Sequence, residues 1–268
     1  MTQDQRPPAG STWETVRLER SDFGVSLLKL NNPPVNAVTP TVIEEMLNAV
    51  DVVSADRAIR AVVLCGTDSR FCAGADLAVM ETLDRTNYRR MRRWIDVQDA
   101  LERLEKPVVC AIERYALGGG AEVSLACDIR VMGRTAQIGF PETDMGLFPG
   151  AGGTQRLTRL VGVSRAFAAM AFGRRYRGPE ALEAGLVDEV VDDADVLDRA
   201  VAVATELAGR PTRALGLLKR CIYEGWNMDL AAGIQREEDA VFELLGTSDV
   251  REGIRAFHEG RPAVFTGS

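Results

Sequence analysis

Hydrophobic and polar residues alternate in two segments near the start of the chain, residues 14–20 and residues 25–30. Residues 21–24 between them favour a turn, so the pattern predicts a β-hairpin. Residues 31–38 contain adjacent prolines and several asparagines, which is typical of a loop. Thr39 or Thr41 can cap the helix that the next apolar positions predict, and we expect this helix to end near residue 54.

Short apolar runs bounded by turn residues then alternate with helical patterns. The runs predict buried parallel strands, and the apolar spacing between them predicts helices that bury one face. The expected strands are residues 61–66, 107–112, 128–132 and 186–191, and the expected helices are residues 86–105, 119–127, 154–161, 164–172 and 179–184. This alternation predicts an α/β fold.

Beyond residue 193 the pattern predicts helices alone, over residues 193–208, 211–226, 229–245 and 248–260. We therefore expect two regions in the chain. A core over residues 1–195 carries the active site, and a helical region covers residues 196–268.

Charge and composition narrow the classes of function. The 268-residue chain has a formal net charge of −7, which argues against a nucleic-acid partner because such partners favour a basic face. The five cysteines include no CxxC pair, which predicts free thiols in a reducing compartment such as the cytoplasm. No apolar run approaches the roughly 20 residues of a membrane helix, and no secretion signal stands at the start, which is polar and expected to be loose. His258 is the only histidine, so a zinc site with His ligands or a Ser–His–Asp triad is hard to build.

Three glycine-bearing segments are candidates for the chemistry of the protein. FCAGADL (residues 71–77) follows a predicted buried strand, although it also fits a strand-to-helix turn capped by Asp76. LGGGAE (residues 117–122) leaves N–H groups free at a helix start, where an anion or a developing oxyanion is stabilised; it also fits a tight turn with Glu122 in the first helical turn. GFPETDMGLFPGAGG (residues 139–153) surrounds Glu142 with apolar residues that should raise its pKa, although an exposed loop carboxylate is the ordinary alternative.

The three segments together predict one site. Two turns that each follow a buried strand can direct one N–H apiece at a single oxygen, and we choose Ala75 and Gly119 as the donors. The strand after the Glu122 helix is expected to return the chain to the same sheet edge and bring Glu142 near. The sequence therefore predicts an enzyme that stabilises an oxyanion and moves protons with two glutamates.

Four motifs in this order carry a resemblance to a known family: FCAGADL, YALGGGAEVSLACD, GFPE and GLFPGAGGTQRLTRLVG. With Glu122 and Glu142 twenty positions apart, the chain resembles the enoyl-CoA hydratase/isomerase (crotonase) family over nearly its whole length. The resemblance implies a spiral of ββα units and a C-terminal all-helical region that forms a homotrimer or a homohexamer. It also implies an acyl-CoA substrate, with coenzyme A as part of that substrate, and no separate cofactor, metal or membrane partner.

The same resemblance implies roles for individual residues. The N–H groups of Ala75 and Gly119 hold the thioester oxygen, Glu122 helps activate water for attack at Cβ, and Glu142 supplies the proton to Cα. Further substrate contacts are expected at Ala73, whose carbonyl meets the adenine, and at Gly74, Asp76, Leu77 and Gly118. The implied reaction is hydration of a trans-2-enoyl-CoA to a 3-hydroxyacyl-CoA, by default in fatty-acid β-oxidation.

Some positions depart from the family pattern. Ala78 stands where many members have a basic residue that helps to hold coenzyme A, and residues 31–38 and 113–115 also differ from the more usual forms. Double-bond isomerisation is the nearest alternative reaction, but isomerases often need only the carboxylate at the Glu142 position. Dienoyl isomerases use a carboxylate where this chain has Gly150. A hydrolase built on Ser124 and His258, or a non-catalytic scaffold that touches RNA, fits the sequence less well.

Two further groups of residues have alternative roles. The basic run of Arg89, Arg90, Arg92 and Arg93 can form a phosphate clamp, although a solvated helix face is the preferred interpretation. The second group can line an acyl pocket or belong to the core; its members are Met80, Leu83, Phe140, Leu147 and Phe148.

Overall fold

The computed structural model describes residues 13–82 and 84–268. The loose start expected for the chain and Leu83 lie outside the described residues. A six-stranded sheet with the order β1-β2-β3-β4-β6-β9 forms the centre of the core. Its strands are β1 (Val16–Arg20), β2 (Val25–Leu30), β3 (Ala61–Gly66), β4 (Val108–Ile112), β6 (Ile129–Gly133) and β9 (Glu189–Val191).

The large sheet confirms most of the predicted strands. β1 and β2 form the predicted antiparallel hairpin, and all the other neighbouring strands pair parallel. β3 and β4 are buried along their whole length, which explains why both are continuous apolar runs in the sequence. The last predicted strand, over residues 186–191, is shorter than expected because only its second half pairs with β6.

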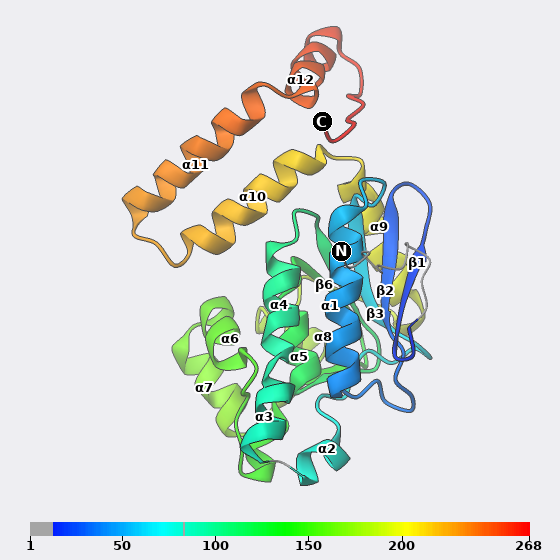
Figure 1. Ribbon diagram of the computed structural model, residues 1–268, viewed down its shortest axis with the longest axis vertical. Coiled ribbons are helices and arrows are strands. Elements are labelled where there is room, and N and C mark those ends of the chain that lie inside the picture. Colours follow the sequence, from blue (N-terminus) through cyan, green and yellow to red (C-terminus); the bar gives the residue numbers. More distant parts are fainter. Residues whose placement is uncertain (1–12, 83) are drawn as a thin grey trace, which may run out of the picture.

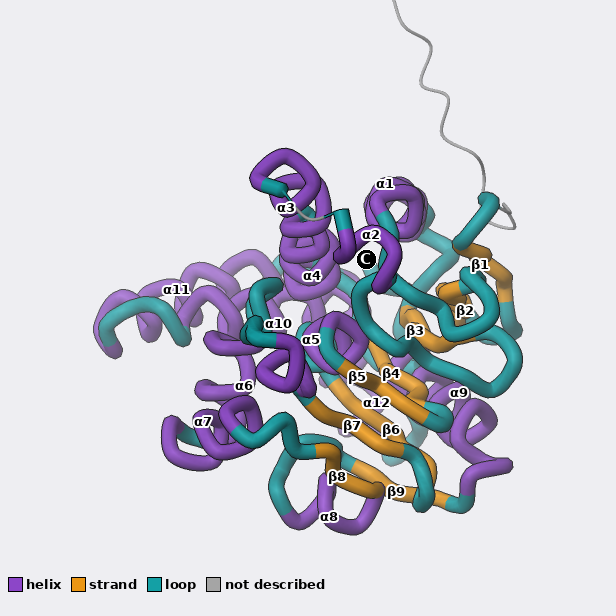
Figure 2. Tube along the Cα trace, turned by 90° about the horizontal axis from the view of Figure 1, so that it is seen from below, coloured by secondary structure: helices purple, strands orange, loops and turns teal. Residues whose placement is uncertain are grey.

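A second sheet, which the sequence pattern does not predict, has the strand order β5-β7-β8. Its strands are β5 (Tyr115–Leu117), β7 (Gln137–Gly139) and β8 (Arg175–Arg177). Three residues are too few to show a strand periodicity. The chain passes from β4 to β5 and then from β6 to β7, so it moves twice from the large sheet to the small one. Figure 2 views both sheets from the end of the molecule where the short helices near residue 80 lie.

Helices follow the strands as the alternating pattern predicts. They are α1 (Pro40–Ala55), α2 (Leu77–Glu81), α3 (Arg85–Arg92), α4 (Trp94–Arg103), α5 (Gly119–Ser124), α6 (Gly153–Val161), α7 (Val163–Ala171) and α8 (Gly178–Glu183), with 3-10 turns η1 (Pro141–Met145) and η2 (Asp193–Asp195). Helix α1 begins at a predicted cap, since the Val42 N–H donates to Thr39 Oγ1 at 3.2 Å. The prediction of a single helix over residues 86–105 is wrong. This segment is divided at Arg93, because α4 buries an apolar face on the core whereas α3 buries Met91 alone.

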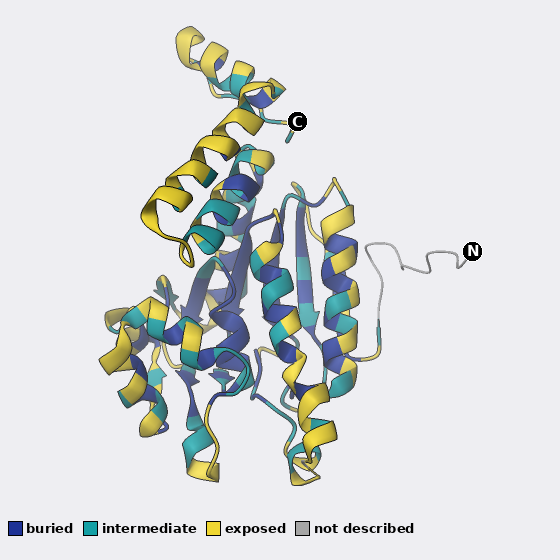
Figure 3. Ribbon diagram, turned by 60° about the vertical axis from the view of Figure 1, so that its left-hand side comes forward, coloured by how far each residue is buried: buried dark blue, intermediate teal, exposed yellow. Residues whose placement is uncertain are grey.

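The last four helices are α9 (Val196–Ala208), α10 (Thr212–Gly225), α11 (Leu230–Leu245) and α12 (Ser248–Glu259). Helix α9 packs on the large sheet through a row of small residues, among them Ala200 and Ala204, against Val63 and Val109. Helices α10 to α12 extend away from the sheets (Figure 1), and much of their surface is exposed (Figure 3). The division after residue 195 stays a prediction, with α9 beyond it packed on the sheet. No helix in the described residues is long and apolar enough to cross a membrane.

Candidate active site

Four extended segments lie side by side and bring the predicted motifs together. The N–H of Leu117 in β5 donates to the Cys72 carbonyl at 3.0 Å, which places the FCAG segment against β5 on one side. On its other side, the Val38 N–H donates to the Gly74 carbonyl at 2.8 Å. β7 completes the row, because it pairs parallel with β5 in a register that sets Leu117 opposite Gly139. Residues 31–38, expected as a loop, therefore help to position the site.

The N–H groups of Ala75 and Gly119 face the same space. Residue 38 bonds to Gly74 and Asp76, so the backbone N–H of Ala75 points to the opposite side, where α5 begins. A Cβ built at Gly119 would stand 3.8 Å from the Ala75 nitrogen, and one built at Gly74 would stand 3.4 Å from the Gly119 nitrogen. Within the described part of the chain, neither N–H donates a hydrogen bond. Two free donors this close can bind one oxygen.

Glycine is required where the two turns touch. Gly74 has φ of +98° and Gly118 has φ of +52°, a region that side chains rarely adopt. A Cβ at Gly74 would come within 2.7 Å of the Leu117 carbonyl oxygen, and a Cβ at Gly118 within 3.1 Å of Glu142 Oε1. A side chain at either position would therefore push apart the groups that form the site.

Trp94 supports the Gly119 end of the site, and the sequence analysis missed this role. Its indole Nε1 donates to the Gly119 carbonyl at 2.8 Å, and the residue is 2% exposed at the start of α4. A buried indole N–H normally needs a partner, so this bond holds α4 and the start of α5 together. The only sequence signal was an apolar position on an amphipathic helix, which does not distinguish this role from core packing.

Glu122 is held by backbone amides at the start of α6. It lies in α5, is 3% exposed, and its Oε1 accepts the N–H groups of Ala151 and Gly153, both at 2.9 Å. The pKa of the Glu122 carboxyl is raised, because burial raises it more than these two amides and the charge of Arg156 lower it. The second half of the GFPETDMGLFPGAGG segment thus supplies the amides, a contact that the sequence analysis did not anticipate.

Glu142 reaches the site from η1, directly after β7. The pairing of β7 with β5 brings it there, rather than the strand of the large sheet that was expected to do so, although the predicted proximity to Glu122 is observed. Burial, together with the nearby charge of Glu122, raises the pKa of Glu142 to about 7. Its Oε2 is buried and has no hydrogen-bond partner among the described residues. Such a carboxyl can hold or release a proton near neutral pH.

All the predicted site residues line one cavity of about 660 Å³. They are Ala73, Gly74, Ala75, Asp76, Leu77, Gly118, Gly119, Glu122 and Glu142. Asp76 also caps α2, since the Val79 N–H donates to its Oδ1 at 3.1 Å. The alternative role of Asp76 as a helix cap is therefore confirmed.

The remaining candidates divide between cavity and core. Met80, Leu147 and Phe148 line the cavity, whereas Phe140 is fully buried in the core. Within the basic run, Arg92 lines the cavity and Arg93 pairs with Glu44 and Asp96.

A Ser–His pair is not formed. Ser124 is buried in α5 and its hydroxyl donates to the Ala121 carbonyl at 2.7 Å. His258 lies in the last turn of α12, at the far end of the molecule from α5 (Figure 1). This arrangement removes the serine hydrolase alternative.

Comparisons with known proteins agree with the geometry. The sequence model of the enoyl-CoA hydratase/isomerase family matches residues 20–268. The chain is 35% identical to a mitochondrial enoyl-CoA hydratase of Pongo abelii, over 96% of this chain and 89% of that protein. It is 37% identical to a putative enoyl-CoA hydratase/isomerase, YngF, of Bacillus subtilis, over 91% of this chain and 95% of that protein.

Solved structures show the same fold. The crystal structure of an enoyl-CoA hydratase from Bacillus anthracis matches with a TM-score of 0.91 and 35% identity, over 95% of this chain and all of that one. That of Geobacillus kaustophilus matches with a TM-score of 0.92 and 30% identity, over 96% of this chain and 98% of that one. These matches confirm the predicted α/β crotonase fold with C-terminal helices. The chain belongs to the enoyl-CoA hydratase/isomerase family.

Proposed function

We propose that the protein is an enoyl-CoA hydratase that adds water across the double bond of a trans-2-enoyl-CoA to give a 3-hydroxyacyl-CoA. The observation that carries the proposal is the presence of two carboxyl groups, Glu122 and Glu142, in one cavity with the free amides of Ala75 and Gly119. By the family resemblance, isomerases often need only the carboxyl at the Glu142 position. The second carboxyl, Glu122, which two amides hold in place, therefore favours water addition.

The proposed mechanism follows from where charge develops. Attack of water at Cβ moves electrons onto the thioester oxygen, and the N–H groups of Ala75 and Gly119 stabilise that negative charge. Glu122, ionised and held by two backbone amides, accepts a proton from the attacking water. Glu142, whose pKa is raised to about 7 and which is partly protonated at neutral pH, delivers a proton to Cα. The proton that Glu122 took from water then passes to Glu142, which restores both groups for the next turnover. The proposed steps need no separate cofactor. Coenzyme A is part of the substrate.

We assign the two ends of the cavity to the two ends of the substrate. Ala73, Gly74, Asp76, Leu77 and Gly118 are proposed to hold the coenzyme A portion, with the Ala73 carbonyl near the adenine. Fatty-acid β-oxidation is the proposed pathway.

Apolar side chains that follow Glu142 in the sequence are proposed to receive the acyl chain. Met145 and Phe148 line the cavity and are 54% and 69% exposed, which favours an apolar ligand.

A comparison of two substrates tests the proposed reaction. The protein is expected to remove the conjugated-thioester absorbance of a short trans-2-enoyl-CoA rapidly. Glu122→Gln should lower this rate by roughly 100- to 10,000-fold, because the water loses its base. Any isomerisation of a 3-enoyl-CoA should decline much less in the same variant. An isomerase would show the reverse order of substrates, and a scaffold would turn over neither.

The pH dependence of hydration should be bell-shaped in kcat/KM. The rate rises with pH as Glu122 ionises and falls as Glu142 loses its proton, so the alkaline limb should lie close to pH 7. Because the two carboxyls interact, the apparent pKa of each limb belongs to the pair and not to one residue. A rate that keeps rising between pH 7 and pH 9 would contradict the assignment of Glu142 as the acid.

The assembly is proposed to be a homotrimer or a homohexamer. Large apolar side chains are exposed on α7 and on the C-terminal helices; they include Phe167 and Phe172 near α7, Leu230 and Phe242 on α11, and Phe257 on α12. Exposed apolar surface of this extent is typical of an interface between subunits. All five cysteines are free, which supports the proposal of a reducing, cytoplasmic location.

A further inference from the structure

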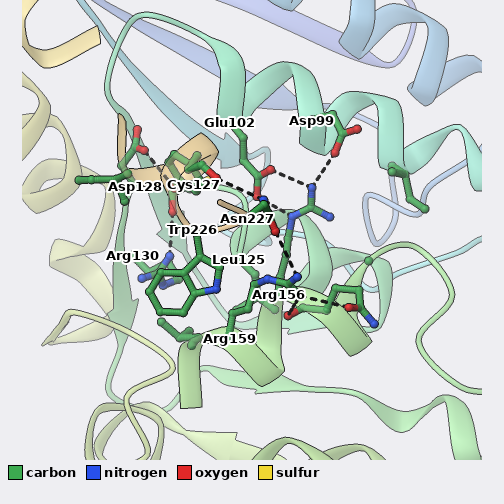
Figure 4. A pocket seen from close by; sticks show the side chains of 16 residues that line it. Asp99, Glu102, Leu125, Cys127, Asp128, Arg130, Arg156, Arg159, Trp226 and Asn227 are labelled. Atoms are coloured by element: carbon green, nitrogen blue, oxygen red, sulfur yellow. Dashed lines mark hydrogen bonds and ion pairs between the residues drawn. The ribbon is translucent and has the colours of Figure 1, made fainter. Parts of the chain in front are cut away.

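A second cavity of about 560 Å³ lies between α4, α6 and α10, and Gly152 of the turn that holds Glu122 is one of its lining residues. Its wall contains the guanidinium group of Arg156, whose side chain is 14% exposed (Figure 4). Arg156 Nε donates to Glu102 Oε1 at 2.6 Å, and Nη2 donates to Asp99 Oδ1 at 2.8 Å and Glu102 Oε2 at 3.0 Å. Nη1 donates to Gln98 Oε1 at 3.1 Å. Four hydrogen bonds to three acceptor residues of α4 therefore fix the position of this group.

The fixed guanidinium lies directly against the turn that holds Glu122. A Cβ built at Gly152 would collide with Arg156 Nη1, so the turn rests on the guanidinium with no room for a side chain. The backbone N–H of Arg156 also donates to the Gly152 carbonyl at 2.9 Å, at the start of α6. Gly152 stands between Ala151 and Gly153, whose amides bind Glu122 Oε1.

The same contacts continue to the other half of the site. Gln98 is fully buried, and its Nε2 donates to the Trp94 carbonyl at 3.2 Å. Trp94 in turn holds the Gly119 carbonyl through its indole. Helix α4 thus supports the Gly119 end directly and the Glu122 end through Arg156.

We propose that Arg156 is a positioning residue, which holds residues 151–153 in the conformation that fixes Glu122 and keeps a positive charge behind that carboxylate. The proposal rests on the proposed function, since it assigns Glu122 the role of base. Arg156 touches neither substrate nor reacting atoms. It acts through the turn and through its charge.

The charges around Glu122 determine the direction in which its pKa should change in each variant. Glu122 faces Glu142 from η1 and Arg156 from α6, and Arg156 faces Asp99 and Glu102 from α4. The other charged or titratable residues that line the second cavity are Asp128, Arg130, Arg159 and Tyr223. The positive charge of Arg156 lowers the pKa of Glu122. Loss of that charge should therefore raise this pKa, whereas loss of the Glu102 charge, which opposes Arg156, should lower it.

Three variants test the two parts of the role, support of residues 151–153 and the positive charge near Glu122. For each variant, the pH profile of kcat/KM for hydration is measured. Arg156→Met should move the acid limb upward by about one unit, the effect of one neighbouring charge, and lower kcat by about 100-fold through misplacement of Glu122. Glu102→Gln should move the acid limb downward, with a smaller loss of kcat. Arg156→Lys keeps the charge but not the four hydrogen bonds, so its acid limb should stay near that of the unmodified protein while kcat falls. KM should change little in all three.

The ¹³C signal of the Glu122 carboxyl, assigned by its loss in Glu122→Gln, measures the same titration without turnover. Opposite shifts in Arg156→Met and Glu102→Gln support the proposal. Shifts in one direction, or full kcat in Arg156→Met, overturn it. If Arg156→Met does not fold, the other two variants decide: Glu102→Gln should move the acid limb downward with a small loss of kcat, and Arg156→Lys should lower kcat with the acid limb unchanged. If the unmodified protein hydrates no enoyl-CoA, the proposed function fails, and the carboxyl titration still decides whether Arg156 controls Glu122.

Discussion

Glutamine in place of Glu142 is expected to lower kcat for hydration of a trans-2-enoyl-CoA by roughly 100- to 10,000-fold. Glutamine keeps the shape of the side chain but has no proton to give to Cα. The carboxyl is suited to this step because burial and the charge of Glu122 raise its pKa to about 7. Steady-state kinetics at pH 6.5, where the acid form is well populated, measures the loss.

A matched control stands on the same short helix. Asp144 also belongs to η1 and lines the same cavity, so Asp144→Asn removes a carboxylate without removing the proposed acid. We expect Asp144→Asn to reduce kcat far less than Glu142→Gln. Equal losses in the two variants would show that general negative charge in the cavity matters, and not proton transfer from Glu142.

Proline in place of Gly119 is expected to lower kcat by roughly 100- to 1000-fold, because it removes one of the two N–H donors. Gly119 is the first residue of α5, a position where proline is well tolerated because its nitrogen needs no helical partner. The change therefore removes the donor and leaves the helix in place. Steady-state kinetics, with circular dichroism as a check of folding, measures the effect.

Gly119→Ala is the control for this variant. Its Cβ would meet the Trp94 indole at 3.4 Å, a tight contact that Gly119→Pro shares, but its N–H remains. The ratio of the two kcat values thus separates the effect of the added Cβ from the loss of the N–H and its replacement by the proline ring carbon. If the alanine and proline variants are equally slow, the Gly119 amide has no role in stabilising the oxyanion.

The residues proposed for the chemistry could be found from sequence because their surroundings break ordinary packing patterns. Three consecutive glycines before Glu122 favour a close approach of the backbone to another group, and Glu142 stands among apolar residues where a carboxylate is costly. The long buried strands were equally clear, since β3 and β4 are apolar throughout. The local sequence pattern was sufficient to predict those positions where one residue type has one main physical reason to be present.

The supporting contacts could not be found in this way because they join distant segments. β5 and β7 have three residues each, yet their pairing brings Glu142 to Gly118. Trp94 and Arg156 have side chains that fit a helix surface or a core equally well, and only the fold shows that they brace Gly119 and Gly152. The break between α3 and α4 likewise follows from which face each helix buries, a consequence of tertiary packing.

A crystal structure of the protein with a bound 3-hydroxyacyl-CoA shows whether two amides and two carboxyl groups meet around one thioester. The thioester oxygen should lie about 2.7–3.1 Å from both the Ala75 and the Gly119 nitrogen, the distance at which amides stabilise an oxyanion. The carboxyl groups of Glu122 and Glu142 should flank the Cα–Cβ bond, with the 3-hydroxyl group between them. A thioester oxygen bound by other groups, or an acyl chain that leaves either glutamate out of reach of those carbons, would contradict the account.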